Sequence, residues 1–283
     1  MILIDYSGLA FAAALSHLTT TREEPSTELL RHLVLNSIRA ITARHKGTYG
    51  PTVVLAMDGK NYWRRNAFPH YKHKRKAQRE SSGQDWKKVF ELLEPLKQEF
   101  PVSLPYKTIR IDDAEADDII GILGMAYAPH EPILIVSSDK DFIQLHGYGP
   151  HVNQYSPAKK AMLNNPHPSQ FLKELILNGD TGDGIPNVLS ADDTFVAGVR
   201  QKPLTKKKLE SMMSLPVIDL PLEIQRNYIR NQQLIDFTQI PQTVATQINE
   251  AYNQSMPASS QTFLNYLVAH RCTALVSCIQ DFL

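Results

Sequence analysis

The chain has 283 residues, of which 42% are hydrophobic and 21% charged, so it is long enough to bury a substantial core and has an ordinary globular composition. No run of about 18 apolar residues occurs, which excludes a membrane-spanning helix. Cys272 and Cys278 have neither metal-site nor redox-motif spacing, and we expect free thiols in a reducing compartment. The N-terminus enters an apolar run without a basic leader, which predicts a cytoplasmic protein.

Charge is distributed unevenly along the chain. Residues 60–79 contain eight Lys or Arg residues and no acid, whereas the formal net charge of the whole chain is only +1. The remainder therefore carries −7. A basic block on an acidic body indicates a polyanionic partner that is bound at one place.

The elements in the first half alternate between strand and helix. Continuous apolar runs predict buried strands at residues 2–4, 53–57 and 133–136, and helix-period stripes fall at residues 29–41 and 119–127. This alternation predicts an α/β fold, with a central, mostly parallel sheet flanked by helices. After about residue 170 helical periodicity dominates. We therefore expect an α/β core over residues 1–190 and a smaller helical region over residues 191–283.

Acidic residues follow the predicted strands. Asp5, Asp58 and Asp139 each come at or just after a strand end, and parallel α/β sheets bind ligands beyond the carboxyl ends of their strands. Further acids stand in the segments "EADD", "DKD" and "GDTGD". The full set of candidate metal ligands is Asp5, Asp58, Glu115, Asp117, Asp118, Asp139, Asp141, Asp180 and Asp183.

Gathering these carboxylates requires cations. Two unit charges about 5 Å apart repel by roughly 3 kcal/mol at an effective dielectric constant of 20. Oxygen ligands without matching His or Cys spacing favour Mg²⁺, with Mn²⁺ as a substitute. Enough acids exist for two ions, which in phosphodiester hydrolysis hold the attacking and leaving oxygens. An aspartyl phosphoenzyme built on "DKD" is an alternative, but it leaves the basic block unexplained.

The basic block "NYWRRNAFPHYKHKRKAQRE" mixes cations with aromatic residues. Cations neutralise phosphates, and Tyr62, Trp63, Phe68 and Tyr71 could stack on exposed bases. A solvated basic helix is the simpler interpretation of the charge run alone. Together with the acidic strand ends, the block favours a nucleic-acid interface.

The ordered set of motifs resembles the flap endonuclease/5′-3′ exonuclease family, and is closest to its T-even-phage type, called ribonuclease H. The motifs are strand–Asp5, strand–Asp58, the basic segment, "EADD", "SSDKDFIQL" and "GDTGDGIP". The resemblance implies a PIN-like 5′-nuclease core with a basic helical arch at about residues 60–90. It also implies a two-metal hydrolase that acts on the 5′ ends of RNA/DNA hybrids, duplex DNA and flaps, as in primer removal during lagging-strand replication.

The same resemblance assigns roles to particular residues. Asp5, Asp58, Glu115, Asp117 and Asp139 would serve the first metal, and Asp141, Asp180 and Asp183 the second, with Asp118 nearby. Lys72 and Arg75 would act with Asp139 in catalysis by steering the scissile phosphate. The residues expected to bind nucleic acid are Arg64, Arg65, Lys72, Lys74, Arg75 and Lys76.

The chain departs from the family pattern after residue 186. Members usually continue with a glycine-rich hairpin that grips duplex backbone, often with a monovalent cation, whereas this chain reads "NVLSADDTFVAGVRQKPLTKKK". The resemblance also implies a monomer in the cytoplasm of a host cell, without membrane contact, with a single-strand-binding protein and a sliding clamp as possible partners. A PIN-like single-strand endoribonuclease and a non-catalytic nucleic-acid-binding accessory are alternatives.

Overall fold

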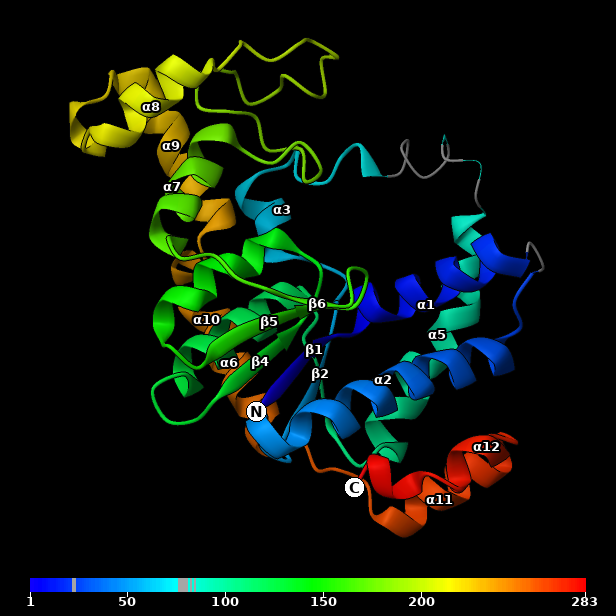
Figure 1. Cartoon of the computed structure of the whole chain (residues 1–283). Helices are drawn as coiled ribbons and strands as arrows, with labels where there is room; N and C mark the ends of the chain where they lie inside the picture. Colours follow the sequence, from blue (N-terminus) through cyan, green and yellow to red (C-terminus); the bar gives the residue numbers. More distant parts are fainter. Residues whose placement is uncertain (22–23, 76–80, 82, 84) are drawn as a thin grey trace.

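The computed structural model describes residues 1–21, 24–75, 81, 83 and 85–283, and a six-stranded sheet forms its centre (Figure 1). The strand order is β3-β2-β1-β4-β5-β6, and every neighbouring pair is parallel except the edge pair β5–β6. The strands are β1 (Ile2–Asp5), β2 (Val53–Met57), β3 (Lys107–Arg110), β4 (Ile133–Val136), β5 (Val152–Ser156) and β6 (Ala161–Leu163). The predicted mostly parallel α/β fold is confirmed.

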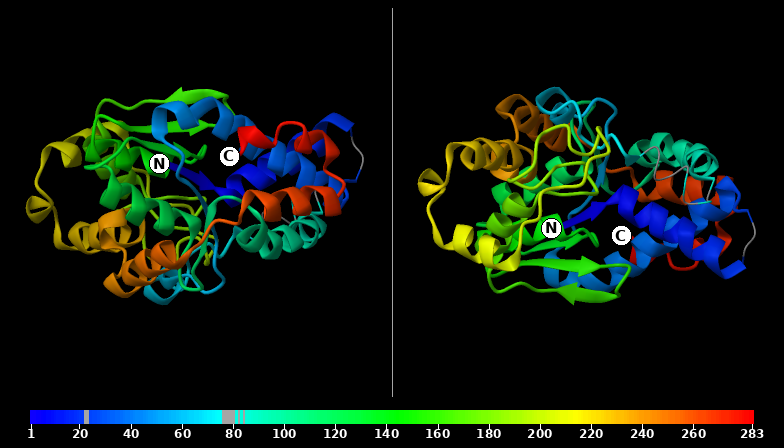
Figure 2. Two further views of the ribbon diagram at one scale, coloured as in Figure 1. Left: turned by 90° about the horizontal axis from the view of Figure 1, so that it is seen from below. Right: turned by 90° about the horizontal axis from the view of Figure 1, so that it is seen from above.

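The central strands are apolar without interruption because both faces of the sheet are covered. Alternate residues of a strand point to opposite faces. Ile2 and Ile4 belong to a core shared with α1 (Tyr6–Thr21), α2 (Thr27–Tyr49) and α5 (Trp86–Ser103). Leu3 belongs to the opposite core with α6 (Ala116–Tyr127), and all three of these side chains are fully buried. Figure 2 shows the helical layers on the two sides.

The C-terminal third is helical but does not form a layer of its own. The 3₁₀ helix η1 (Lys140–Tyr148) follows β4, and the helical elements after β6 are α7 (Pro168–Asn178), α8 (Lys206–Ser214), η2 (Val217–Asp219), α9 (Leu222–Ile235), η3 (Phe237–Gln239), α10 (Gln242–Gln254), α11 (Ser260–Ala269), α12 (Thr273–Val276) and η4 (Ile279–Asp281). Helices α7, α8 and α9 surround a separate apolar cluster, whereas α10 packs on α6 and β3. The boundary at residues 190/191 stays a prediction.

The direction in which successive strands are added to the sheet reverses between β1 and β4. The connections from β1 to β2 and from β2 to β3 run in one direction across the sheet, and α6 then returns the chain to β4 on the other side of β1. Ligands bind at such a switch point, outside the carboxyl ends of the strands. Asp5 and Asp139 lie there. None of the described helices is long and apolar enough to cross a membrane.

Candidate active site at the carboxyl edge of the sheet

Three strand-end acids begin the site, and serine hydroxyls hold the carboxylates of two of them. Ser137 donates from Oγ to Asp5 Oδ2 at 3.0 Å, which ties the end of β4 to the end of β1. Ser7 donates from Oγ to Asp58 Oδ2 at 2.6 Å, which ties the first turn of α1 to the end of β2. Asp139 accepts the amide of Asp141 at 3.0 Å and caps η1. The edge of the sheet therefore positions these carboxylates from separate segments.

Gly8 is fitted closely against Asp5. Its amide donates to Asp5 Oδ1 at 2.9 Å, and a Cβ atom at this position would lie 2.6 Å from Asp5 Oδ2. Real Cβ contacts are longer than that, so any side chain here would displace the Asp5 carboxylate. The requirement for glycine comes from this close approach and not from an unusual backbone angle.

The start of α6 contributes the "EADD" acids. Glu115 is the N-cap, and Asp118 accepts its amide at 2.9 Å to close a capping box. Both side chains are buried and both pair with Arg64 Nη1, at 3.0 Å for Glu115 and 2.7 Å for Asp118. Asp118 also accepts from Trp63 Nε1 at 3.2 Å. This geometry makes Asp118 an anchor for the entry of the basic segment.

Arg64 lies inside the protein instead of on its surface. Its side chain is only 4% exposed, and Nε donates to the carbonyl oxygen of Leu234 at 2.8 Å. The guanidinium thus joins α3 (Trp63–Ala67), α6 and the end of α9. In this structure it has no surface with which to contact a phosphate. Arg65, the next residue, is exposed and stacks over the Tyr62 ring at 4.8 Å.

The basic segment folds back onto the acidic edge. Lys72 pairs through Nζ with Glu115 and, at 3.5 Å, with Asp183, while its amide donates to the Asp183 carbonyl at 2.7 Å. Arg75 Nη2 lies 2.6 Å from Asp183 Oδ1. The Tyr71 hydroxyl lies 2.8 Å from Glu115 Oε2 and 2.9 Å from Asp183 Oδ2, so the two carboxylates share its single proton. Two of the predicted catalytic cations therefore lie directly against predicted metal ligands.

The "GDTGD" loop is held together by its own acid. Asp180 Oδ1 accepts the amides of Gly182 at 2.7 Å and Asp183 at 3.2 Å, and its second oxygen pairs with Lys140 at 3.2 Å. Lys140 lies between Asp139 and Asp141 in sequence. The loop after α7 is thereby joined to the start of η1, so the second group of predicted ligands meets the first.

The pKa values divide the acids into two classes. Burial, and then the charges of Asp58 and Asp139, raise the pKa of Asp5 to about 6. Desolvation followed by neighbouring carboxylates also raises the pKa of Asp117 and Asp141 well above the usual range. Asp139 remains accessible to solvent at the open edge, but surrounding protein atoms partly desolvate it and raise its pKa. These acids repel one another without full compensation.

Asp183 belongs to the second class. Burial by itself would raise the pKa of its carboxyl, but the cations of Lys72 and Arg75 outweigh that effect and hold the pKa below the usual value. Its charge is therefore balanced within the protein. Lys72 responds in the opposite direction: burial lowers its pKa, yet Asp183 and Glu115 raise it above the usual value.

The donor set fits a divalent cation with oxygen ligands, although the acids are not gathered into a ready coordination shell. Asp141 Oδ1 is buried and has no hydrogen-bond partner among the residues that the structure describes, as expected of an oxygen available to bind a cation. Within the described residues, however, no group of three or more His, Cys, Asp or Glu side chains is placed to hold a metal ion. A metal site here would therefore require side-chain movements around Asp5, Asp117, Asp139 and Asp141.

The predicted stacking of bases on the basic segment needs correction. Trp63, Phe68 and Tyr71 are 7%, 4% and 5% exposed, because they pack into the interior instead of facing a nucleic acid. Tyr62 is half-buried, and Lys74 lies over the ring of Phe195 at 4.9 Å. Lys76 and the part of the predicted arch at residues 76–80, 82 and 84 lie outside the described residues.

Several supporting residues were not found from the sequence. Ser7 follows Asp5 by two positions, but serine at a strand end carries no specific signal. Ser137 begins the motif "SSDKDFIQL", but the sequence assigned it no role. Gln154, on β5, donates to the carbonyl oxygens of Ser137 at 2.9 Å and Asp139 at 2.6 Å, and it is fully buried. No local pattern marks it, because its role depends on the pairing of β4 with β5.

Known proteins resemble the chain over its whole length. Residues 1–173 match the family described as "5'-3' exonuclease, N-terminal resolvase-like domain", and residues 171–282 match "T4 RNase H, C terminal". Ribonuclease H of enterobacteria phage T4 is 32% identical, over 99% of this chain and 95% of the relative. A 5'-3' exonuclease of Buchnera aphidicola is 29% identical over 60% of this chain and 58% of the relative. Flap endonuclease Xni of a Shewanella species is 33% identical over 48% of this chain, which spans only 52% of that relative.

Solved structures of phage T5 proteins share the fold. The T5 5'-exonuclease with bound divalent zinc ions superposes with a TM-score of 0.62 at 16% identity, over 90% of this chain and 98% of that one. A T5 flap endonuclease in complex with DNA and metal ions gives a TM-score of 0.58 at 18% identity, over 89% and 99% of the two chains. The chain therefore belongs to the 5'-3' exonuclease and flap endonuclease family of nucleases, with a C-terminal region of the T4 ribonuclease H type.

Proposed function

We propose that the chain is a divalent-metal-dependent 5′-to-3′ nuclease that hydrolyses phosphodiesters at the 5′ ends of RNA/DNA hybrids, duplex DNA and flaps. The observation that carries the proposal is the set of mutually repelling carboxylates at the sheet edge, directly beside Lys72 and Arg75. Carboxylates whose negative charges are not balanced within the protein favour the binding of metal ions. The adjacent lysine and arginine side chains would bind the phosphate group that such metal ions would polarise.

The acids would form two sets of ligands, one for each of two Mg²⁺ ions. Asp5, Asp58, Glu115, Asp117 and Asp139 would hold one ion, and Asp141, Asp180 and Asp183 the other. When bound, the ions would supply Lewis-acid stabilisation of the attacking and leaving oxygens. Asp118 acts as the anchor of Arg64 and Trp63, and keeps the start of α6 in place.

Lys72 and Arg75 have a second role in this scheme. In the free protein they neutralise Glu115 and Asp183. An incoming phosphate offers these cations a new partner, so that substrate binding would release acceptor oxygens of both acids toward the metals. The lysine and arginine would then orient the scissile phosphate, because charge-assisted hydrogen bonds to phosphate are strong and directional.

The finer assignment to primer removal in lagging-strand replication rests on the relative named ribonuclease H in phage T4. Flap endonuclease Xni, the name of a further relative, supports flaps as a substrate class. We extend the proposal to a monomer acting in the host cytoplasm, with a single-strand-binding protein and a sliding clamp as partners.

Cleavage of a 5′-labelled flap duplex and of a 5′-labelled RNA/DNA hybrid tests the proposal. We expect short 5′ products with Mg²⁺ or Mn²⁺, none with EDTA, and loss of cleavage in Asp139→Asn. Asp113→Asn is the matched control, because Asp113 is an exposed acid just before the "EADD" segment. Full activity of Asp139→Asn would refute the mechanism. Efficient cutting of circular single-stranded RNA would favour an endoribonuclease, and binding without turnover would favour an accessory protein.

A further inference from the structure

Gln154 places an amide inside the sheet at a position that an apolar side chain could fill. It lies on β5 in register with Ile135 of β4, and it is fully buried. Val152, two residues earlier on the same strand, belongs to the apolar core that includes residues of α6 and η1, as does Ile135. Alternate residues of a strand share a face, so the Gln154 side chain lies on the side of this core. Burying an amide there is unfavourable unless its hydrogen bonds are satisfied.

The amide continues the hydrogen bonding between β4 and β5 beyond the end of the strand. The ladder extends to the bond from the amide of Ser137 to the carbonyl oxygen of Tyr155, at 3.1 Å. Gln154 Nε2 then donates to the carbonyl oxygen of Ser137 at 2.9 Å and to that of Asp139 at 2.6 Å. One side chain thereby fixes the peptide group that follows Ser137 and the peptide group that follows Asp139.

The segment that Gln154 fixes orients two of the proposed metal ligands. The amide of Asp139 donates to Ser137 Oγ at 3.1 Å, and this hydroxyl donates to Asp5 Oδ2 at 3.0 Å. Asp139 Oδ1 accepts the amide of Asp141 at 3.0 Å. A shift of the backbone at residues 137–139 would therefore move the Asp139 carboxylate relative to that of Asp5.

The oxygen of the same amide is not well satisfied. Gln154 Oε1 and His146 Nε2 are both buried, and neither has a hydrogen-bond partner among the described residues. Burial lowers the pKa of His146, and an interaction with Gln154 only partly offsets this effect. A buried oxygen without a regular hydrogen bond costs free energy. The stability of the sheet alone therefore does not account for an amide at this position.

We propose that Gln154 is a positioning residue of the metal site, which holds Asp139 and, through Ser137, Asp5 in the arrangement that binds a divalent cation. The inference rests on the proposed function and adds to it a residue that contacts neither the substrate nor the metal. Loss of a side chain that supports a metal ligand typically reduces metal affinity or activity by about 10–100-fold.

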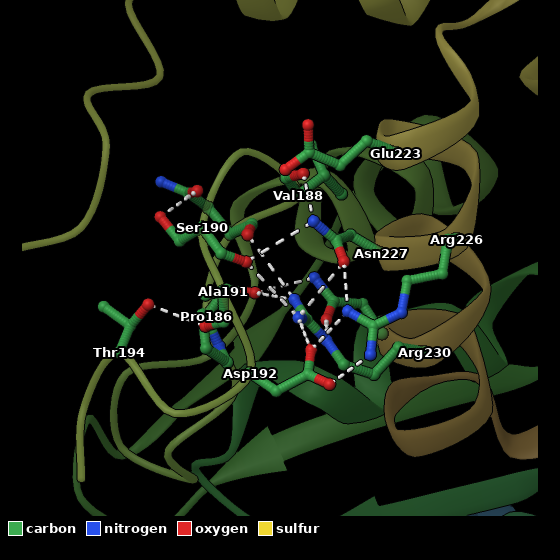
Figure 3. A network of polar contacts seen from close by, with 12 residues as sticks. Pro186, Val188, Ser190, Ala191, Asp192, Thr194, Glu223, Arg226, Asn227 and Arg230 are labelled. Carbon is green, nitrogen blue, oxygen red and sulfur yellow. Dashed lines mark hydrogen bonds and ion pairs between the residues drawn. The ribbon is translucent and has the colours of Figure 1, made fainter. Parts of the chain in front are cut away.

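A second buried amide provides a matched control. Asn227 of α9 is 2% exposed and donates from Nδ2 to the carbonyl oxygen of Val188 at 2.9 Å. It belongs to a network in which Asp192 pairs with both Arg226 and Arg230 (Figure 3). This network also holds backbone carbonyl groups, but it contains none of the proposed metal ligands. Removal of the Asn227 amide therefore shows the effect of losing a buried amide by itself.

The test compares Gln154→Met with Asn227→Leu, because both substitutions remove the amide and keep a side chain of similar size. We expect Gln154→Met to raise the half-saturating Mg²⁺ concentration for cleavage of a 5′-labelled flap duplex by about 10–100-fold. KM for the flap at saturating Mg²⁺ should stay unchanged, since Gln154 is buried away from the substrate. Asn227→Leu should lower the melting temperature by a similar amount to Gln154→Met and leave the Mg²⁺ requirement unchanged.

A readout that needs no cleavage is the rise in melting temperature that Mg²⁺ or Mn²⁺ produces in the absence of nucleic acid. This rise should be smaller in Gln154→Met than in the wild type and in Asn227→Leu. Gln154→Asn serves if Gln154→Met does not fold. Its amide is one methylene group shorter and cannot reach both carbonyl oxygens, so we expect a change in the same direction.

The two readouts separate this inference from the proposed function. If the wild type cleaves and the Gln154 variants match Asn227→Leu in both the Mg²⁺ requirement and the metal-induced rise, the positioning role is wrong while the nuclease assignment stands. If the wild type cleaves nothing but the metal-induced rise is still smaller in Gln154→Met than in Asn227→Leu, the nuclease assignment fails and the positioning role remains.

Discussion

At the scale of single residues, the position of the Asp5 carboxylate depends on the absence of a side chain at Gly8. Gly8 sits within the first turn of α1, where alanine would ordinarily favour the helix by about 1 kcal/mol. Glycine is nevertheless needed, because a Cβ atom would approach Asp5 Oδ2 to 2.6 Å. A local preference for helix is therefore given up for the placement of a proposed metal ligand.

Gly8→Ala should reduce the cleavage rate of a flap substrate by about 10²-fold, since misplacing a reacting group by about 1 Å has an effect of that size. Gly47→Ala is the matched control: Gly47 lies in α2 and a Cβ there meets nothing within 4 Å. The control should retain full activity and melt slightly higher than the wild type. Normal turnover in Gly8→Ala would show that Asp5 tolerates displacement.

The carboxyl groups with raised pKa values predict how stability depends on pH in EDTA. The pKa of Asp5 is about 6 in the folded protein and about 3.9 in an unfolded chain, so the folded state binds more protons between these values. The contribution of Asp5 to the free energy of unfolding is therefore greatest below about pH 4. It decreases as the pH rises through 6, by up to about 3 kcal/mol in total.

Asp141→Asn tests the repulsion directly, because it removes one of the acids whose pKa is raised by burial and then by the neighbouring carboxylates. The metal-free variant should melt several degrees higher than the wild type at pH 7, with a smaller difference at pH 5, and it should lose cleavage activity. Thermal denaturation at both pH values measures this. A lower melting temperature would mean that Asp141 is a structural hydrogen-bond acceptor.

At the scale of elements, α3 shows how adjacent arginines acquire different roles. Arg64 is buried between α6 and the end of α9, whereas Arg65 projects to solvent beside Tyr62. Consecutive residues of an α-helix are rotated by about 100° around the helix axis, so the two side chains point in different directions. The sequence motif contains both, but only Arg65 is available to a nucleic acid in this structure.

Arg64→Met should destabilise the protein by about 3–5 kcal/mol, because it leaves the buried charges of Glu115 and Asp118 without their partner. Arg65→Met should change stability by less than about 1 kcal/mol and should instead weaken binding to a flap duplex. Urea denaturation and fluorescence anisotropy measure the two effects. Equal stability of both variants would contradict the buried ion-pair network.

At the scale of the whole molecule, the fold collects acids from five segments of the chain at one edge of the sheet and places a basic segment against them. Asp5 and Asp139 are separated by more than a hundred residues, yet Ser137 bridges the strands that carry them. Repulsion among the acids opposes folding, and cation binding is expected to reverse that effect. Metal affinity and stability are therefore linked.

Mg²⁺ or Mn²⁺ at about one hundred times its dissociation constant should stabilise the wild type by about 2.7 kcal/mol relative to EDTA. For a protein of this size, that corresponds to a rise of several degrees in melting temperature. Asp139→Asn should respond less, and Ca²⁺ serves as a non-catalytic comparison. An unchanged melting temperature across millimolar Mg²⁺ would argue against a preformed affinity of these acids for the ion.

Much of the fold and the composition of the site followed from the sequence alone. Unbroken apolar runs at 2–4, 53–57 and 133–136 predicted the central strands, because a strand covered on both faces has no polar side. Acids at strand ends predicted where a site would lie, because parallel strands end at a common edge. Both inferences depend on local pattern and on the general geometry of α/β sheets.

Only the tertiary structure decided which residues face which. It buried Arg64, Trp63 and Tyr71, which the sequence grouped with the exposed basic residues, and it recruited Gln154 from β5 to hold the end of β4. It also paired Lys72 with Glu115 across 43 positions of sequence. Charge and aromatic character are properties of the residue and can be read locally, whereas burial and partner choice depend on distant segments that meet only when the chain folds.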